Sequence, residues 1–362
     1  MIRLEEMQQK WEWNNLGFTF QKLMDMIGED YLPVILSKSK YKALCGAKGT
    51  MKTFNFCAIL LWKMCNFPYW NSIVMRNTLS NLKKTTIKTM IKVINFLMNK
   101  HGLTDLAMIK RAVKDPSDSR LEMMDLRKIS FISYENLDNA SGLDTEVGNF
   151  GDIFWDEPIE KSTAKERHIM EKVPKDDFDM IEDSALRGEE LVDIIGDYKV
   201  EYNNNTYVFP LRRNVFFSMN PWSRKMWIYR DYINKLIPFN QKFKDWTLED
   251  AIKNVMLYED RPDFEEGWFI ARLTKGINPH IDTQERARDK QKLLNLNPYN
   301  ATATLGWEYD GADPDIFIWR NYMNKDSTYA KKYLAKNYNN ASKKTAPKTK
   351  PKKKATGIHR RL

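Results

Sequence analysis

Short apolar runs alternate with long helical patterns through the first 220 residues, and this alternation constrains the fold more than any other feature of the sequence. Helical spacing of apolar residues covers the first forty residues, residues 54–65 and residues 82–97. Short buried strands that alternate with helices are typical of an α/β sheet, mostly parallel, with helices on both faces. The strand-like runs are residues 41–45, 72–75, 129–133, 153–155 and 215–218.

A glycine-bearing loop connects the first apolar run to an apolar helix, and it reads GAKGTMKT over residues 46–53. This segment matches three of the four fixed positions of the P-loop consensus GxxxxGK[ST]. In such a loop, backbone N–H groups and the helix N-terminus face the phosphates. Lys52 would neutralise the β- and γ-phosphates, and Thr53 would hold Mg²⁺ through its hydroxyl. The residues expected to bind nucleotide are Gly46, Ala47, Lys48, Gly49, Thr50, Met51, Lys52 and Thr53.

Met51 replaces the second glycine of the consensus. It must adopt a backbone conformation that glycine normally supplies, so we expect a wider or slightly remodelled loop. Taken by itself, a degenerate match of this kind is equally compatible with an accidental loop that contains a lysine.

A second motif favours the P-loop interpretation. DIFWDEP, over residues 152–158, is an apolar strand that ends in two adjacent acids, which is a Walker B pattern. Asp156 would bind the hydration shell of Mg²⁺, and Glu157 would orient and activate the attacking water. The alternative is a strand followed by a solvated acidic turn. A P-loop about a hundred residues upstream, with room for several β–α units between, favours the Walker B interpretation.

A third motif, NVFFSMNP over residues 214–221, is a buried strand that ends in a small hydroxyl residue and an amide. In many P-loop motors a polar residue at this place contacts the γ-phosphate or the attacking water, which makes Asn220 a candidate catalytic residue. Alone, this motif is better explained as a strand end followed by an Asn-Pro turn.

Taken in order, these motifs and their flanks resemble the ATPase domain of tailed-phage terminase large subunits. The similarity covers roughly residues 35–320, and it rests on the ordered set rather than on any single motif. The matching segments are GAKGTMKT, SIVMRNTLSNLKKTTIKTM, SYENLDNASGL followed by FGDIFWDEP, RNVFFSMNPWSRKMWIYRDYI, and ATATLGWEYDGADPDIFIW.

The resemblance implies a P-loop NTPase fold of the ASCE type and ATP-driven translocation of double-stranded DNA into a procapsid. ATP and Mg²⁺ are the cofactors it implies, and double-stranded DNA, a portal protein, a small terminase subunit and a homo-oligomeric ring are the partners. Such motors also need a cation on the charge that develops at the γ-phosphate. Lys48 is one candidate for this role, and Arg76 and Arg187 are candidate arginine fingers.

The character of the sequence changes after about residue 221, where strand-like runs become scarce and residues 222–237, 248–257 and 283–296 read as helices. Terminase large subunits usually continue into an RNase H-like nuclease domain, and too few residues remain here for one, so we expect no nuclease activity. The acidic cluster at residues 259–266 is better explained as a solvated loop than as a metal site. The expected organisation is a helical N-terminal segment (1–30), a P-loop ATPase domain (30–240), a helical linker (241–325) and a disordered basic tail (326–362).

The net charge of +10 is concentrated at the end of the chain. Residues 331–362 contain twelve Lys or Arg and no Asp or Glu, so the other 330 residues sum to about −2. Such a tail would bind polyanions without sequence preference and with a steep salt dependence. The alternative is a solubilising extension with no binding role.

Composition limits the remaining function classes. The three cysteines form no CxxC pair, so we expect buried, reduced thiols rather than disulfides or a zinc site. No apolar stretch is long enough for a transmembrane helix and no signal peptide is evident, which indicates a cytoplasm. The resemblance to terminase large subunits implies the host bacterial cytoplasm, with transient residence at the procapsid portal and absence from the mature virion. The rival functions are another P-loop DNA motor, such as a helicase, and a non-catalytic nucleotide-binding protein of capsid assembly.

Overall fold

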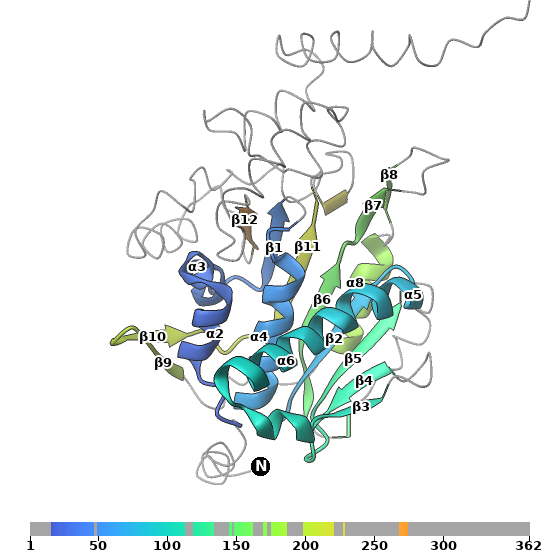
Figure 1. Ribbon diagram of the computed structural model, residues 1–362. Helices are drawn as coiled ribbons and strands as arrows, with labels where there is room; N and C mark the ends of the chain where they lie inside the picture. Colours follow the sequence, from blue (N-terminus) through green and yellow to red (C-terminus); the bar gives the residue numbers. More distant parts are fainter. Residues whose placement is uncertain are drawn as a thin grey trace, which may run out of the picture.

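A computed structural model of the chain, drawn in Figure 1, defines the fold. The residues that the structure describes are 16–46, 49–112, 119–133, 145–146, 148–161, 169–171, 175–186, 198–220, 227–228 and 268–273.

The centre of the fold is one eight-stranded sheet in the order β12-β1-β11-β6-β2-β5-β4-β3. The neighbours from β12 to β5 are all parallel, whereas β4 and β3 extend the sheet antiparallel at one edge. β11 lies between β1 and β6. The strands are β1 (Tyr41–Gly46), β2 (Trp70–Arg76), β3 (Lys110–Ala112), β4 (Ser119–Glu122), β5 (Lys128–Ser133), β6 (Asn149–Asp156), β11 (Asn214–Met219) and β12 (Trp268–Leu273).

Helices cover both faces of this sheet. Phe154 and Trp155 are consecutive on β6, so their side chains point to opposite faces. The ring of Phe154 lies 5.2 Å from that of Phe56 on α4 (Lys52–Asn66), and the ring of Trp155 lies 5.4 Å from that of Phe178 on α8 (Lys175–Ala185). The predicted mostly parallel sheet with helices on both faces is therefore confirmed.

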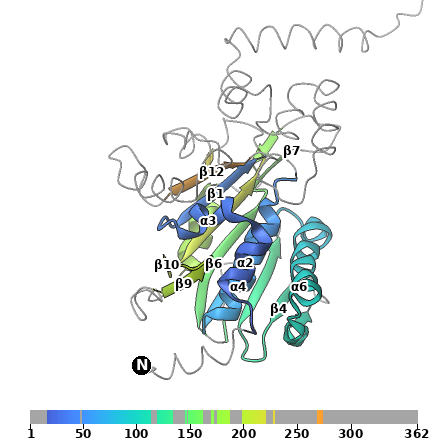
Figure 2. The ribbon, with the colours of Figure 1, turned by 60° about the vertical axis from the view of Figure 1, so that its left-hand side comes forward.

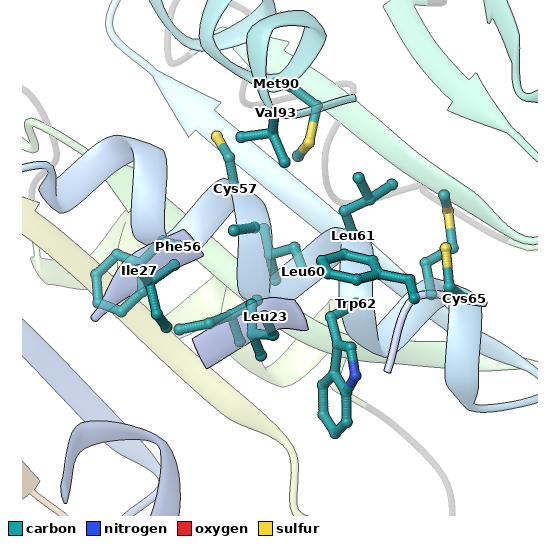
Figure 3. Close-up of a cluster of buried hydrophobic side chains, with 14 of the residues drawn as sticks. Leu23, Ile27, Phe56, Cys57, Leu60, Leu61, Trp62, Cys65, Met90 and Val93 are labelled. Carbon is teal, nitrogen blue, oxygen red and sulfur yellow. The ribbon is translucent and has the colours of Figure 1, made fainter. Parts of the chain in front are cut away.

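The face that carries α4 holds the larger core. In Figure 2, α6 runs beside α4 on this face, and the two helices contact each other. Figure 3 shows Leu23 of α2 and Leu60 of α4 in a cluster that also includes Met90 and Val93 of α6. Nearly all of α4 is buried because the sheet, α2 and α6 enclose it, which explains its apolar sequence. The other helices here are α2 (Phe20–Ile27), η1 (Glu29–Tyr31), α3 (Leu32–Leu36), α5 (Leu79–Leu82), the π-helical turn η2 (Lys83–Ile87), α6 (Lys88–His101) and η3 (Thr104–Met108).

All five predicted strands are present, as β1, β2, β5, β6 and β11. The predicted helix over residues 54–65 begins two residues earlier as α4, and the pattern over residues 82–97 falls within the longer series α5, η2 and α6. The two β-hairpins, β7 (Ile159–Lys161) with β8 (Ile169–Glu171) and β9 (Tyr198–Tyr202) with β10 (Asn205–Phe209), were not expected.

One domain boundary requires correction. The sheet includes β12, which lies inside the segment predicted as a helical linker and beyond the predicted domain end at residue 240. The short, mostly apolar run WFIARL is ambiguous between helix and strand, and only its parallel pairing with β1 decides. The helices predicted over 222–237, 248–257 and 283–296, apart from residues 227–228, and the basic tail lie outside the described residues.

The cysteine and membrane expectations can be checked within the described ranges. Cys57 and Cys65 are buried free thiols, and burial raises the pKa of the Cys65 thiol to about 12. Burial also raises the pKa of Cys57, and the nearby Asp156 carboxylate adds to this effect. Among the helices described, none combines the length and the apolar character needed to cross a membrane.

Candidate nucleotide-binding site

The carboxyl ends of β1, β11, β6 and β2 meet at one edge of the sheet. β1 leads into the P-loop, β6 ends at Asp156, β2 ends at Arg76, and Asn220 directly follows β11. Open α/β sheets bind their ligands outside the carboxyl ends of the strands. The fold thus brings three motifs that lie far apart in the sequence to a single place.

The loop between β1 and α4 accommodates Met51 without moving the start of the helix. Met51 adopts the left-handed conformation, with φ 61° and ψ 11°, and Gly49 has φ 90°. α4 begins at the next residue, and the N–H of Asn55 donates to the carbonyl of Met51 over 2.8 Å. A residue with a Cβ in this conformation costs about 1–2 kcal/mol. Met51 therefore adopts a left-handed conformation of the kind that glycine normally supplies. Ala47 and Lys48 lie outside the described residues.

The Lys52 ammonium lies above the loop and is held by oxygen acceptors. Its Nζ donates to the Gly46 carbonyl over 2.9 Å, to the Thr50 hydroxyl over 3.4 Å and to the Asn220 side-chain oxygen over 3.1 Å. A cation fixed at a helix N-terminus, beside backbone N–H groups, is suited to bind an anionic phosphate chain.

Asp156 is fully buried and accepts four hydrogen bonds from side chains. Its Oδ1 accepts from the hydroxyls of Thr53, over 2.9 Å, and Ser218, over 2.6 Å. Its Oδ2 accepts from the Arg76 guanidinium and the Thr86 hydroxyl, each over 2.5 Å. A carboxylate offers about four lone-pair positions, so these donors occupy the whole group.

The predicted metal ligands, Thr53 and Asp156, are adjacent, and their chemistry fits Mg²⁺. Because the Thr53 hydroxyl donates its proton to Asp156, the lone pairs of Thr53 Oγ1 point away from the carboxylate. A hard cation that prefers oxygen ligands and retains several waters could bind that oxygen directly. Because its lone pairs are already engaged, Asp156 would then act by orienting Thr53 rather than as a direct ligand.

Glu157 is the most accessible acid of this site, with 27% of its side chain exposed. Its φ of 53° is in the left-handed region, and its N–H donates to the Ser218 carbonyl over 2.8 Å. Its Oε2 accepts from Arg76 over 2.5 Å and its Oε1 from the Asn220 amide over 3.3 Å. Since the other end of that amide accepts from Lys52, Asn220 links the P-loop lysine to Glu157. Backbone strain of this kind is often found at functional sites.

The predicted cations fall into two groups. Arg76 lies within the site, where it forms ion pairs with both Asp156 and Glu157. Lys48 and Arg187 lie outside the described residues, so their roles stay predictions.

Two contributors to the site were not assigned from the sequence. Thr86 reaches Asp156 from η2, and Tyr31 reaches the P-loop from η1, where its hydroxyl donates to the Thr50 carbonyl over 2.5 Å. The threonine-rich turn at residues 85–86 is a weak sequence signal for the first contact. No sequence pattern signals the second, because it joins residues from separate elements.

Similarity to known proteins is found among solved structures. No protein-family model and no curated protein matches the chain. Among solved structures, the chain is similar to the large terminase of thermophilic bacteriophage D6E in complex with ADP, at 12% identity and a TM-score of 0.45, over 79% of this chain and 52% of that one. It thus spans about half the length of the D6E protein.

Two further solved structures are similar at comparable or lower levels. The ATPase domain of the Thermus phage P74-26 large terminase matches at 12% identity and a TM-score of 0.41, over 76% of this chain and 90% of that one. The bacteriophage Phi-29 viral genome packaging motor assembly matches at 10% identity and a TM-score of 0.33, over 58% of this chain and 50% of that one. Likeness at this level assigns no activity.

Proposed function

We propose that this chain is a Mg²⁺-dependent ATP hydrolase that drives the translocation of double-stranded DNA into a phage procapsid. One observation carries the proposal. Residues from three separate motifs form two hydrogen-bonded groups at the carboxyl edge of the sheet, and Arg76 joins the groups by contacting both Asp156 and Glu157. One group is Lys52, Asn220 and Glu157, and the other is Thr53 and Asp156. Phosphoryl transfer requires positioning and electrostatic stabilisation more than covalent chemistry, and these groups supply both.

Each residue has a distinct part in this mechanism. Lys52 would bind the β- and γ-phosphate oxygens, and Thr53 would hold the metal ion. A bound Mg²⁺ neutralises charge on those phosphates. Glu157, the most accessible acid of the network, orients the attacking water and accepts its proton. Asn220 contacts both Lys52 and Glu157, so it senses whether the phosphates are present.

Double-stranded DNA as the substrate of the motor is supported by an uneven charge distribution within the fold. Residues 31–104 contain twelve Lys or Arg and no Asp or Glu. Lys84, Lys88 and Lys92 are exposed and spaced by four residues, which places them on one side of a continuous helical segment. They span about 12 Å at 1.5 Å per residue, a length that covers three or four phosphates of one strand. Thr86, on the same segment, contacts Asp156, which connects this lysine row to the nucleotide site.

Hydrolysis by the purified chain tests the first part of the proposal. We expect Mg²⁺-dependent ATP hydrolysis that double-stranded DNA stimulates, and loss of nucleotide binding in Lys52→Ala. A chain that binds ATP without turnover in the presence of DNA would instead support the non-catalytic capsid-assembly function. Strand separation coupled to hydrolysis would support a helicase.

A charge-matched pair of variants tests the lysine row. Replacing Lys84, Lys88 and Lys92 by Ala should make the slope of log K for DNA binding against log salt concentration shallower by about three. It should also reduce the stimulation of hydrolysis by DNA. The control replaces the exposed Lys38, Lys199 and Arg212 by Ala, which removes the same charge from other elements. Equal losses in both triple variants would contradict a specific DNA surface on this helix.

The remaining partners belong to the same proposal. A portal protein, a small terminase subunit and assembly into a homo-oligomeric ring follow from the resemblance of the motifs to terminase large subunits. Procapsids that carry a portal should therefore stimulate hydrolysis, whereas procapsids without a portal should not. Equal rates with both would contradict docking at the portal.

A further inference from the structure

Met51 stands where the P-loop consensus has glycine, and an interaction outside the consensus residues can help to keep its left-handed conformation. Met51 is in the left-handed conformation immediately before Lys52, and its N-cap position has no side-chain hydrogen bond. Leaving this conformation would relieve Met51 but would rotate the Thr50–Met51 peptide plane and displace the start of α4. An interaction that holds that peptide would offset part of the cost of this conformation.

Tyr31 supplies such an interaction. Its side chain is fully buried, and its hydroxyl donates to the carbonyl of Thr50 over 2.5 Å. This carbonyl belongs to the peptide whose rotation sets φ of Met51. In a trans peptide the C=O and N–H groups point in opposite directions. Holding the Thr50 carbonyl toward Tyr31 thus directs the Met51 N–H away from Tyr31, and it prevents the carbonyl oxygen from turning toward bound phosphates.

The position of Tyr31 is itself well determined. It ends the short helix η1 and precedes α3, whose second residue is Pro33. Glu29, two residues earlier, accepts hydrogen bonds from the Tyr202 hydroxyl, over 2.8 Å, and from the Asn203 amide, over 2.9 Å, both in the β9–β10 hairpin. Tyr31 therefore acts from a segment that the hairpin fixes, rather than from a freely moving terminus.

We infer that Tyr31 is a positioning residue for the phosphate-binding loop, which holds the Thr50–Met51 peptide so that a non-glycine residue retains the geometry of the consensus glycine. This inference rests on the proposed nucleotide site. It explains how the chain tolerates methionine at position 51, and it gives the end of η1 a role in nucleotide affinity.

A double-mutant cycle tests the inference. Tyr31→Phe keeps the buried ring and removes the hydroxyl, and we expect the Kd for ADP to rise about tenfold, because a buried carbonyl loses its donor. Met51→Gly removes the cost of the left-handed conformation. In that background, Tyr31→Phe should change Kd less than about twofold, and the double variant should bind more tightly than Tyr31→Phe alone.

A matched control separates positioning from general stability. Tyr41→Phe removes a tyrosine hydroxyl too. This hydroxyl donates to the Glu182 carboxylate over 2.7 Å, and Tyr41 lies at the opposite end of β1 from the loop. This variant should leave ADP affinity unchanged. If Tyr31→Phe leaves Kd unchanged, or changes it equally with and without the Met51→Gly substitution, the positioning role is wrong. If the unmodified chain binds no ADP, or Lys52→Ala binds it as tightly, the nucleotide site itself is wrong.

Discussion

Two buried aspartates on the same strand, Asp152 and Asp156, show how one element can support structure at one end and chemistry at the other. They lie four residues apart on β6 and are both fully buried. Alternation along a strand places both on the face covered by α4, together with Phe154. Their different surroundings determine what each can do.

Asp152 is enclosed by groups that fix it in place. Its Oδ1 accepts from the Lys63 ammonium over 2.7 Å, and its Oδ2 accepts from the Trp70 indole N–H over 2.6 Å. Lys63 also donates to the Asn214 side chain over 2.8 Å and lies 4.7 Å from the centroid of the Trp70 ring. Burial raises the pKa of the Asp152 carboxyl, and the Lys63 charge offsets part of that rise.

A bulge in the sheet makes this arrangement possible. The register between β2 and β6 shifts at residues 71–72, so Gly151 has no partner on β2. A Cβ on Gly151 would lie 2.3 Å from the Trp70 ring. Glycine at this position therefore allows the indole to lie against β6 and to reach Asp152.

Asp156 instead contacts groups that a ligand can engage. Thr53 and Arg76 come from the P-loop helix and β2, and the neighbouring Glu157 is partly exposed. Along α4, Thr53 and Lys63 are about 15 Å apart, and Asp152 and Asp156 are about 13 Å apart along β6. The two carboxylates thus tie both ends of α4 to one strand, which holds the phosphate-binding end of the helix in register with Asp156.

The largest expected effect is on turnover at the Asp156 end. Asp156→Asn removes the negative charge that orients Thr53 and attracts the metal ion, and we expect ATP hydrolysis to fall by about 1,000-fold or more. The fold should remain, because Arg76 keeps its ion pair with Glu157. Steady-state assays measure the hydrolysis rate, and thermal unfolding measures stability. If Asp156→Asn unfolded as readily as a variant of Asp152, the two carboxylates would not differ in their contribution to stability.

A comparable loss of turnover, by about 100- to 10,000-fold, is expected for Glu157→Gln, because the general base is removed while the phosphate-binding groups stay. ATP affinity should change little. Turnover within a few-fold of the unmodified chain would contradict the role of Glu157, and loss of ATP binding would show that the side chain acts in ground-state binding instead.

At the other end of β6, the expected effect is on stability. Lys63→Met leaves Asp152 buried without its cation, and we expect the free energy of unfolding to fall by about 3–5 kcal/mol. Hydrolysis per folded molecule should remain close to normal. Adding Asp152→Asn to this variant should recover part of the loss, which denaturant unfolding can measure. If the double variant is no more stable than Lys63→Met, the ion pair does not explain the effect.

The same variant should also acquire a pH dependence. Without Lys63, the pKa of Asp152 in the folded state rises further above the ordinary value of about 3.9. A raised carboxyl pKa stabilises the folded state at pH values below the unfolded pKa, and that contribution is lost as pH rises through the folded pKa. Lys63→Met should therefore be least destabilised near pH 4 and progressively more so toward neutrality. A destabilisation that is constant over this range would contradict the burial of an unpaired carboxyl.

The smallest effect is expected for Trp70→Phe, which keeps most of the apolar contact and removes the indole donor to Asp152. We expect a loss of about 1–2 kcal/mol in unfolding free energy, since Lys63 still pairs with the carboxylate. Equilibrium unfolding measures it. A loss as large as that of Lys63→Met would show that the indole, rather than the ion pair, holds this end of the strand.

Local patterns in the sequence determined much of the fold and the composition of the candidate site. Apolar runs of three to five residues predicted five strands of the sheet, and the order of motifs predicted that Lys52, Thr53, Asp156, Glu157 and Asn220 belong together. These inferences succeed because strand period, loop chemistry and adjacent acids are properties of neighbouring residues.

Only the tertiary structure decided how those residues are connected. Arg76 was one of three candidate cations, and its contact with Asp156 and Glu157 depends on β2 lying beside β6 in the sheet. The Lys63–Asp152 pair, the hydrogen bond from Tyr31 to Thr50 and the place of β12 beside β1 each join segments far apart in the chain. Strand order and helix packing determine such contacts, and no local sequence pattern encodes them, because each partner is an ordinary residue in its own segment.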